Sequence, residues 1–256
     1  MRLRLDATLV KRGLATTRTE AVRLIEAGVV TVGGAFADKP SRMVSVADPV
    51  EVLRTPRFVS RGGDKLEGAL AASGVVVEGR SVMDAGASTG GFVDCLLQRG
   101  ARRVLAVDVG HNQMHERIRM NPRVTSREGV NVRNFSPADM PFPSSLVVAD
   151  LSFISLTKVV AKLVRCCTPE ENFPVPQLIL LVKPQFEVGR AEASRGRGVI
   201  TDPELHRQAI ESVMGALNQS GAFVEGVVES PIKGTEGNTE FFVFARTLPE
   251  SLVCSP

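Results

Sequence analysis

The segment from Ser81 to Gly110, SVMDAGASTGGFVDCLLQRGARRVLAVDVG, restricts the fold of this chain more than any other segment. It reads as an apolar strand, a glycine-rich turn, a helix that ends at Gly100 and a second strand that ends near Asp108. This order predicts a βαβ unit, in which the helix connects two parallel strands. The chain is therefore expected to contain an α/β domain.

Later segments continue the same pattern. Apolar runs lead to Asp150 (SLVVAD) and Lys183 (QLILLVK), and strand-like runs at 222–230 and 239–246 follow a helix-like segment at 202–221. Strands that alternate with helices predict a mainly parallel sheet with both faces covered and with ligands beyond the C-terminal ends of the strands. Charged residues at those strand ends are thus the first candidates for chemistry.

The glycine turn indicates the class of ligand. Gly86, Gly90 and Gly91 do not form the GxGxxG of a dinucleotide fold, and the Gly-Lys-Ser/Thr of a phosphate loop is missing. Asp84 before the turn and Asp108 after the next strand suit a ligand with a cationic end and ribose hydroxyls, as in S-adenosylmethionine. Asp84 and the glycines would accommodate the methionine end, and Asp108 would accept hydrogen bonds from the ribose. A tight strand-to-helix connection without a ligand is the alternative.

The N-terminal part of the chain follows a different pattern. One short helix is predicted before Gly13 and another after Thr17, because Thr17 and Glu20 form a capping-box pattern. Short strands with a hairpin turn at Gly33 follow. Residues 1–61 carry 11 Lys+Arg against 6 Asp+Glu, a net charge of +5, which leaves −2 for the rest of a chain with net charge +3. Such an excess is either a solvated face or a phosphate-binding surface.

The pattern R-L-D…R-G-L…R…A…L-I…G-x-V-x-V-x-G…K-P, over residues 2–53, resembles the S-four-type RNA-binding domain. The resemblance implies a small α+β RNA-binding domain at 1–53, and Pro56 with a glycine pair indicates a linker at 54–63 before a large domain at 64–256. A long loop at 186–201 is predicted to form an RNA-contacting lid. The candidate RNA contacts are basic residues of these segments, namely Arg4, Lys11, Arg12, Arg18, Arg23, Arg61, Arg195 and Arg197.

Residues 57–246 resemble the FtsJ-like ribose 2′-O-methyltransferases, whose Lys-Asp-Lys-Glu tetrad corresponds here to Lys65, Asp150, Lys183 and Glu240. With the N-terminal domain included, the chain is similar to the TlyA family of bacterial rRNA cytidine 2′-O-methyltransferases, once called hemolysins. The stretches VSRGGDKL, DAGASTGGF, DVG, DLSFISL, VKPQFEVG and KGTEGNTEFF carry this resemblance.

The resemblance implies a Rossmann-like, S-adenosylmethionine-dependent methyltransferase with a mainly parallel seven-stranded sheet. The implied partners are ribosomal RNA and the ribosomal subunits, and the protein is expected to be a cytoplasmic monomer that binds no membrane. Candidate cofactor-binding residues cluster around the glycine turn and the neighbouring strand ends: Asp84, Gly86, Ser88, Gly90, Gly91, Phe92, Asp108, Asn131 and Asp150.

The expected reaction explains the residue types of the tetrad. A ribose hydroxyl is a poor nucleophile, so its proton must be removed or its oxygen tightly oriented while it attacks a methyl group in line. Lys183 is the candidate for this role, as base or as orienting group. Methyltransferases that act on base amino groups typically carry D/N-P-P-Y/F where this chain has Asp150-Leu-Ser-Phe153, and no cysteine nucleophile stands nearby.

One departure from the family pattern lies after Asp108. The chain reads DVGHNQM where an aromatic DVGYGQL is usual, and it contains neither Trp nor Tyr, so His111 is the candidate for a cofactor-side contact. Two alternative functions remain: an RNA-binding protein with an inactive methyltransferase-like domain, and a membrane-active hemolysin. Against the latter, no apolar run approaches the roughly 20 residues of a membrane helix, and no signal peptide is evident. The Cys and His spacing predicts neither a metal site nor a disulfide framework.

Overall fold

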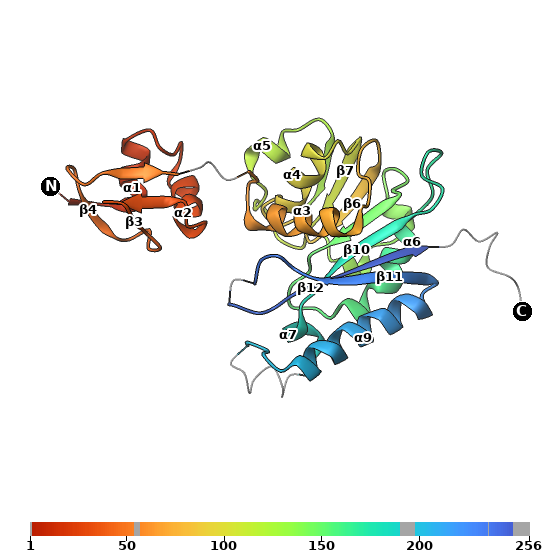
Figure 1. Ribbon diagram of the computed structural model, residues 1–256. Helices are drawn as coiled ribbons and strands as arrows, with labels where there is room; N and C mark the ends of the chain where they lie inside the picture. The colour runs from red at the N-terminus through yellow and green to blue at the C-terminus, as the bar shows by residue number, and fades with distance from the viewer. Residues whose placement is uncertain (1, 54–56, 190–197, 235, 248–256) are drawn as a thin grey trace, which may run out of the picture. The chain divides into compact units, whose positions relative to one another are not determined.

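The computed structural model describes residues 2–53, 57–189, 198–234 and 236–247. Contacts divide the chain into two compact units, Met1–Arg61 and Gly62–Pro256 (Figure 1). No helix of the described residues has both the length and the apolar character needed to cross a membrane.

The first unit is a small α+β domain. Its core consists of buried aliphatic side chains such as Leu5, Leu9 and Ile25. Thr17 caps the second helix by accepting a hydrogen bond from the Glu20 backbone N at 3.1 Å. The strands form a two-stranded sheet, β1-β4, and a three-stranded antiparallel sheet, β3-β2-β5. In chain order the elements are β1 (Arg2–Arg4), α1 (Leu5–Lys11), α2 (Arg18–Glu26), β2 (Val30–Val32), β3 (Ala35–Phe36), β4 (Met43–Ser45) and β5 (Val50–Val52).

The second unit is built on one seven-stranded sheet, in the order β11-β12-β10-β9-β6-β7-β8. β12 alone runs in the opposite direction to the other six strands of this sheet, so the predicted mainly parallel α/β fold is confirmed. The strands are β6 (Ser81–Ala85), β7 (Arg103–Val107), β8 (Val124–Arg127), β9 (Leu146–Ala149), β10 (Gln177–Val182), β11 (Ala222–Glu229) and β12 (Phe241–Thr247).

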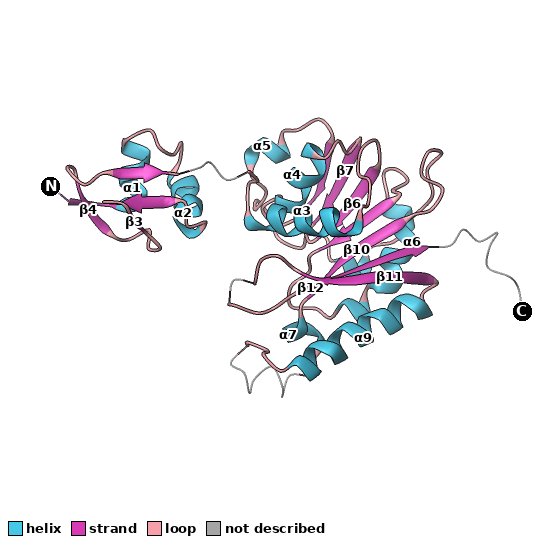
Figure 2. Cartoon of the chain, viewed as in Figure 1, coloured by secondary structure: helices cyan, strands magenta, loops and turns pink. Residues whose placement is uncertain are grey.

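Helices cover both faces of this sheet, with α3 and α4 on one side and α6 and α9 on the other (Figures 1 and 2). Helix α3 begins at Arg61, so the last three residues of the segment interpreted as a linker are helical. The α-helices are α3 (Arg61–Ser73), α4 (Gly91–Gln98), α5 (Glu116–Arg119), α6 (Val160–Cys166), α7 (Pro184–Glu187) and α9 (Pro203–Gln219). Short 3₁₀ helices are η1 (Val132–Asn134), η2 (Pro137–Asp139) and η3 (Leu156–Lys158).

The strand register brings the ends of four strands to one edge of the sheet. Ala149 at the end of β9 pairs with Ala85 at the end of β6 and with Leu180 in β10. Because β12 is antiparallel, its first residue, Phe241, pairs with Val182, the last residue of β10. The residues just beyond these positions therefore meet at the C-terminal edge of the parallel strands.

Gly86 allows the turns after β6 and β9 to approach closely. Its φ is +91°, and a Cβ at this position would lie 2.3 Å from the carbonyl oxygen of Asp150. Any other residue would both strain the backbone and collide with the neighbouring turn. This packing fixes Asp150 beside the glycine turn.

Candidate active site and cofactor cavity

The four tetrad residues form two ion pairs at the C-terminal edge of the sheet. Lys65 on α3 reaches Glu240, just before β12, with its Nζ 2.5 Å from Glu240 Oε2. Lys183, just after β10, places its Nζ 2.6 Å from Asp150 Oδ1, just after β9. Since Val182 pairs with Phe241, Lys183 and Glu240 occupy facing positions at the end of the β10–β12 ladder.

The two pairs differ in their access to solvent. Lys65 and Glu240 are 8% and 3% exposed, so this pair is almost sealed. Lys183 and Asp150 keep 11% and 21% of their side-chain surfaces exposed, and Lys183 Nζ also donates to Ser152 Oγ at 3.0 Å. An ammonium group has three donors, so one donor of Lys183 remains after these two contacts with described residues. The side chains of Lys65 and Lys183 are about equally exposed, at 10% and 11%, so the two pairs differ in their carboxylates: Glu240 is buried, whereas Asp150 is open to the cavity that it lines.

An exposed aromatic side chain stands next to this pair. Phe153 is 91% exposed, and its φ of +64° lies in a region that L residues rarely adopt. Its ring centroid is 5.4 Å from that of Phe186 on α7. Strained backbone of this kind is held in place by its surroundings and is common at functional sites.

Glu187 on α7 supplies part of that support. Its carboxylate accepts hydrogen bonds from Ser155 Oγ at 2.6 Å and from Leu156 N at 2.8 Å, which ties the loop after β9 to the turn after β10. Burial raises the pKa of Glu187 despite these bonds. The sequence analysis did not select Glu187, although the residue lies within the VKPQFEVG stretch.

A cavity of about 490 Å³ opens beside this cluster, beyond the ends of β6, β7 and β9. Asp108 stands in its wall and accepts hydrogen bonds from Ser88 N at 2.8 Å and from Gly110 N at 2.6 Å. The predicted cofactor residues that line it are Gly86, Ser88, Asp108, Asn131 and Asp150. The lining residues that the sequence analysis missed include four valines and two polar side chains: Val107, Val109, Val130, Val132, Gln113 and Arg133.

Four predicted cofactor residues lie outside the cavity lining. Gly90 is the N-cap of α4 and packs closely on Ile118, and Gly91 is buried in the first turn of that helix. Phe92 stacks on Phe242 in the core, with ring centroids 6.2 Å apart. Asp84, the fourth, is completely buried beneath the glycine turn.

The Asp84 carboxylate is electrostatically unusual. Neither of its oxygens has a hydrogen-bond partner among the described residues. Burial raises the pKa of Asp84 well above its ordinary value, and the negative charges of Asp150 and Asp108 raise it further. Three carboxyl groups thus act on one another beside the cavity, an arrangement that favours a cationic ligand.

Comparison with known proteins identifies the family. The FtsJ-like methyltransferase family matches residues 58–247, and the S4 domain matches residues 3–50. The chain is 44% identical over 248 residues to the 16S/23S rRNA (cytidine-2′-O)-methyltransferase TlyA of Mycobacterium tuberculosis, covering 96% of this chain and 90% of that protein. The chain belongs to the TlyA family of FtsJ-like methyltransferases.

Two solved structures extend the comparison. One from Streptococcus thermophilus, which carries a provisional hemolysin name, is 38% identical, with a TM-score of 0.74, and covers 96% of this chain and 88% of that chain. An S-adenosylmethionine-dependent methyltransferase from Mesorhizobium loti shares the fold alone, at 16% identity and a TM-score of 0.51, over 71% of this chain and 97% of that chain.

His111 has a different place from the one expected of it. It is exposed and does not line the cavity. Its ring lies against Gly129, where a Cβ would be 2.6 Å from His111 Nε2. The expected cofactor-side contact of His111 is therefore absent from this structure, and valine side chains provide the apolar walls instead.

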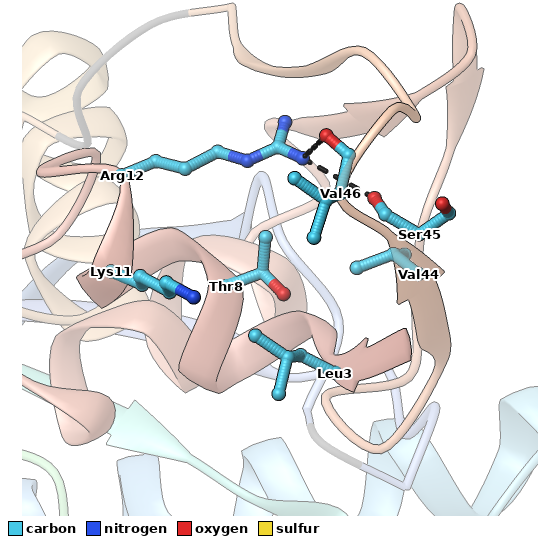
Figure 3. Close-up of a pocket in the computed structure, with 7 residues that line it drawn as sticks. All are labelled: Leu3, Thr8, Lys11, Arg12, Val44, Ser45 and Val46. Atoms are coloured by element: carbon cyan, nitrogen blue, oxygen red, sulfur yellow. Dashed lines mark hydrogen bonds between the residues drawn. The ribbon is translucent and has the colours of Figure 1, made fainter. Parts of the chain in front are cut away.

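Among the residues of the first unit that are predicted to contact RNA, some have exposed side chains and others make hydrogen bonds or ion pairs within the domain. Arg12 is half-buried and donates to the carbonyl oxygens of Val46 at 2.9 Å and Ser45 at 3.3 Å (Figure 3), and to that of Asp48 at 2.8 Å. This side chain holds the loop after β4, so its guanidinium is engaged within the domain. Lys11 is exposed at the rim of the adjacent small cavity, of about 140 Å³, whose apolar lining includes Leu3 (Figure 3).

Arg4 and Arg18 share one buried carboxylate. They lie 2.9 and 3.1 Å from Asp6 Oδ2 while keeping about half of their own surfaces exposed. The hydrogen bond from Arg4, with help from Arg18, lowers the pKa of Asp6 to about 2 although burial opposes this shift. Of the other candidates, Arg23 is half-buried and Arg61 begins α3, whereas Arg195 and Arg197 lie outside the described residues.

Proposed function

We propose that this protein is an S-adenosylmethionine-dependent methyltransferase that modifies the ribose 2′-hydroxyl of cytidine in ribosomal RNA. The observation that carries the proposal is the position of Lys183. Its ammonium group contacts Asp150 and Ser152, which both line the cavity, and one donor remains available. The name of the Mycobacterium tuberculosis relative supports the choice of cytidine and of rRNA from either subunit.

The residues of the cavity fit S-adenosylmethionine. The buried, unpartnered Asp84 and its neighbours Asp108 and Asp150 favour a cation. The valine walls suit a flat adenine ring, and Asp108 offers carboxylate oxygens to a ribose. When bound, this cofactor supplies an electrophilic methyl group on a sulfonium. Residues Gly86, Ser88, Asp108, Asn131 and Asp150 would hold it.

The chain's own residues then act on the acceptor nucleotide. Lys183 donates its remaining hydrogen bond to the 2′-oxygen and orients it, or accepts the hydroxyl proton when its amine is neutral. Asp150 and Ser152 fix the direction of the lysine side chain. The buried pair of Lys65 and Glu240 supports the neighbouring strand end.

Phe153 offers a surface for the nucleobase. A base must leave its helical stack before its ribose can enter a protein site, and stacking on an aromatic ring offsets part of that cost. Phe153 is exposed and lines the cavity next to Ser152. The S4 domain, with Lys11, Arg4 and Arg18 on its surface, would hold the phosphate backbone of the same RNA. An rRNA substrate also implies action in the cytoplasm, and we propose that the protein works as a monomer on ribosomal subunits.

Two measurements separate this proposal from its alternatives. Calorimetry with S-adenosylmethionine should detect binding, and purified ribosomal subunits should accept a labelled methyl group from it. Absence of cofactor binding would remove the proposed activity. Binding without transfer to either subunit would favour an RNA-binding protein with an inactive domain. Lysis of vesicles without any methyl transfer would favour the hemolysin alternative.

A further inference from the structure

Asn238 is a buried polar residue in the turn that leads into β12. It is 1% exposed, so its amide group must find partners within the protein. The side-chain Oδ1 accepts a hydrogen bond from Ile200 N at 2.9 Å, and Nδ2 donates to the carbonyl oxygen of Gly198 at 2.8 Å. One side chain thus satisfies backbone groups of a segment about 40 residues away in the chain.

The same turn carries Glu240, the carboxylate that pairs with Lys65. Asn238 lies two residues before Glu240, and its carbonyl oxygen accepts a hydrogen bond from Gly234 N at 2.9 Å. Ser230 N donates to the carbonyl oxygen of Glu240 at 2.8 Å. A Cβ at Gly234 would lie 2.7 Å from Glu240 Oε1, so the turn packs directly against this carboxylate. A shift of the turn would therefore move Glu240.

A second side chain holds the far side of the same segment. His206 on α9 lies with its Nε2 2.9 Å from the carbonyl oxygen of Ile200, and its ring meets Phe241 edge-on at 5.3 Å between centroids. Ile200 itself is buried. Gly198 to Ile200 are thus held by Asn238 from the turn and by His206 from α9, without belonging to the sheet.

We propose that Asn238 is a positioning residue for the Lys65–Glu240 pair. By joining Gly198 and Ile200 to the turn, it fixes the turn in the place where Glu240 meets Lys65. The pair is nearly sealed, and a buried charge that loses its partner is strongly disfavoured. Loosening the turn would therefore disturb the tetrad while the cofactor cavity, which is lined by other segments, stays intact. This inference rests on the proposed function.

The test is a double-mutant cycle between Asn238 and Glu240, measured as single-turnover methyl transfer to ribosomal subunits. In the wild-type background, Asn238→Ala should lower the rate about 10-fold, because a misplacement of about 1 Å can lower a reaction rate by this factor or more. The cofactor Kd should stay within two-fold of the wild-type value. In a Glu240→Gln background the same change should lower the residual rate less than two-fold, because Asn238 acts through Glu240. Asn238→Asp, a near-isosteric second variant, keeps an acceptor for Ile200 N but turns a carboxylate oxygen toward the carbonyl oxygen of Gly198, so it should lower the rate at least as much as Asn238→Ala.

Two controls make the outcome decisive. Asn218→Ala, on the exposed side of α9, should leave the rate unchanged. His206→Ala should reduce the rate less than Asn238→Ala, because Asn238 still holds Gly198 and Ile200 in that variant. Equal losses in both backgrounds, or a lowered unfolding midpoint with a normal rate per folded molecule, would overturn the positioning role alone. Absence of transfer by the wild-type protein would instead overturn the proposed function, and this inference with it.

Discussion

Charged residues cluster at both ends of the parallel strands of the central sheet, and the carboxylates of the two clusters differ in their hydrogen bonding. At the N-terminal edge, Glu170 accepts hydrogen bonds from the backbone N and the hydroxyl of Ser81, at 2.9 and 2.8 Å, from Ser145 Oγ at 2.6 Å, and from Arg102. At the C-terminal edge, Asp84 is completely buried, whereas Glu170 is only partly buried, and Asp84 has no hydrogen-bond partner within the described part of the chain. One carboxylate is saturated by the protein, and the other is not.

The pKa shifts of the two carboxylates follow from this difference. Burial raises the pKa of Glu170, but the bonds from Ser145 and Ser81 and the charge of Arg102 outweigh it and hold the pKa below its ordinary value. For Asp84, burial and the neighbouring carboxylates all act in the same direction, upward. A saturated polar network stabilises a fold, whereas a buried polar group without partners indicates a place where a ligand completes the structure. The contrast supports the site proposed at the C-terminal edge.

The largest expected effect lies at that edge. Lys183→Ala should lower methyl transfer about 1,000-fold, within the range of general acid–base contributions, because the variant has no group to orient or deprotonate the acceptor hydroxyl. The cofactor Kd should stay within a few-fold, since Lys183 does not line the cavity. Rapid-quench transfer assays and calorimetry measure the two quantities. Lys162→Ala on α6 is the matched control, and near-normal turnover of the Lys183 variant would sink the tetrad assignment.

A substitution at the N-terminal edge should lower stability and leave methyl transfer unchanged. Glu170→Gln should lower the free energy of unfolding by about 2–3 kcal/mol, because it weakens hydrogen bonds to a charged, partly buried group. In the wild type this stabilisation is present above the ordinary pKa of 4.5 and is lost as the pH falls through the lowered pKa of the folded state. Urea unfolding tests both statements, with Glu171→Gln, an exposed neighbour, as control. If the Glu170→Gln variant lost methyl transfer per folded molecule, the two edges would not differ in function as described.

Replacing Asp84, whose carboxylate has no hydrogen-bond partner among the described residues, should weaken cofactor binding without lowering stability. Asp84→Asn should raise the cofactor Kd about 10-fold, equivalent to roughly 1.4 kcal/mol, yet leave the ligand-free protein as stable as the wild type or more so. Because the folded-state pKa is raised, ligand-free wild type should lose stability as the pH rises from 3.8 toward that pKa, and cofactor binding should release protons.

Calorimetry in buffers of different ionisation enthalpy would detect those protons. Asp94→Asn, which affects a buried carboxylate paired with Arg117, is a useful comparison because it should destabilise the protein without weakening cofactor binding. Unchanged cofactor affinity in the Asp84 variant would make the glycine turn purely structural.

The smallest effect is expected in the first unit, the S4 domain. Lys11→Gln should weaken binding to ribosomal subunits only a few-fold and lower the salt dependence by about one unit of slope, the loss of a single phosphate contact. Filter binding at several salt concentrations provides the slope, with Lys39→Gln as control. Arg18→Glu is a poorer probe than the sequence suggests, because Arg18 also pairs with buried Asp6. An unchanged slope would remove Lys11 from the interface.

The sequence predicted those features whose causes are local. The glycine turn, the apolar strands that end at Asp150 and Lys183, and the Thr17 cap all follow from nearest-neighbour patterns, and the structure contains each of them. Strand β8 was missed because Val124–Arg127 is a half-buried edge strand with little apolar character.

Features that depend on distant partners could not be predicted. Glu170 bonds to Ser81 across 89 positions, and Arg12 to Asp48 across 36, so neither residue carries a local sign of its structural role. Asp84 was assigned to the cofactor from its place before the turn; all five residues of β6 are buried, and Asp84 does not line the cavity. The cavity walls at Val130 and Val132 depend on how the segment after β8 folds back.

The most direct test of the proposed activity is the chemical identity of the methylated nucleoside. Ribosomal subunits incubated with the protein and labelled S-adenosylmethionine can be digested to nucleosides and separated by liquid chromatography with mass detection. If the tetrad at the C-terminal edge catalyses ribose methylation, label will appear in 2′-O-methylcytidine with the wild-type protein. No label will appear in this nucleoside with the Lys183→Ala variant. Label in a base-methylated nucleoside, or equal labelling by the Lys183 variant, would contradict it.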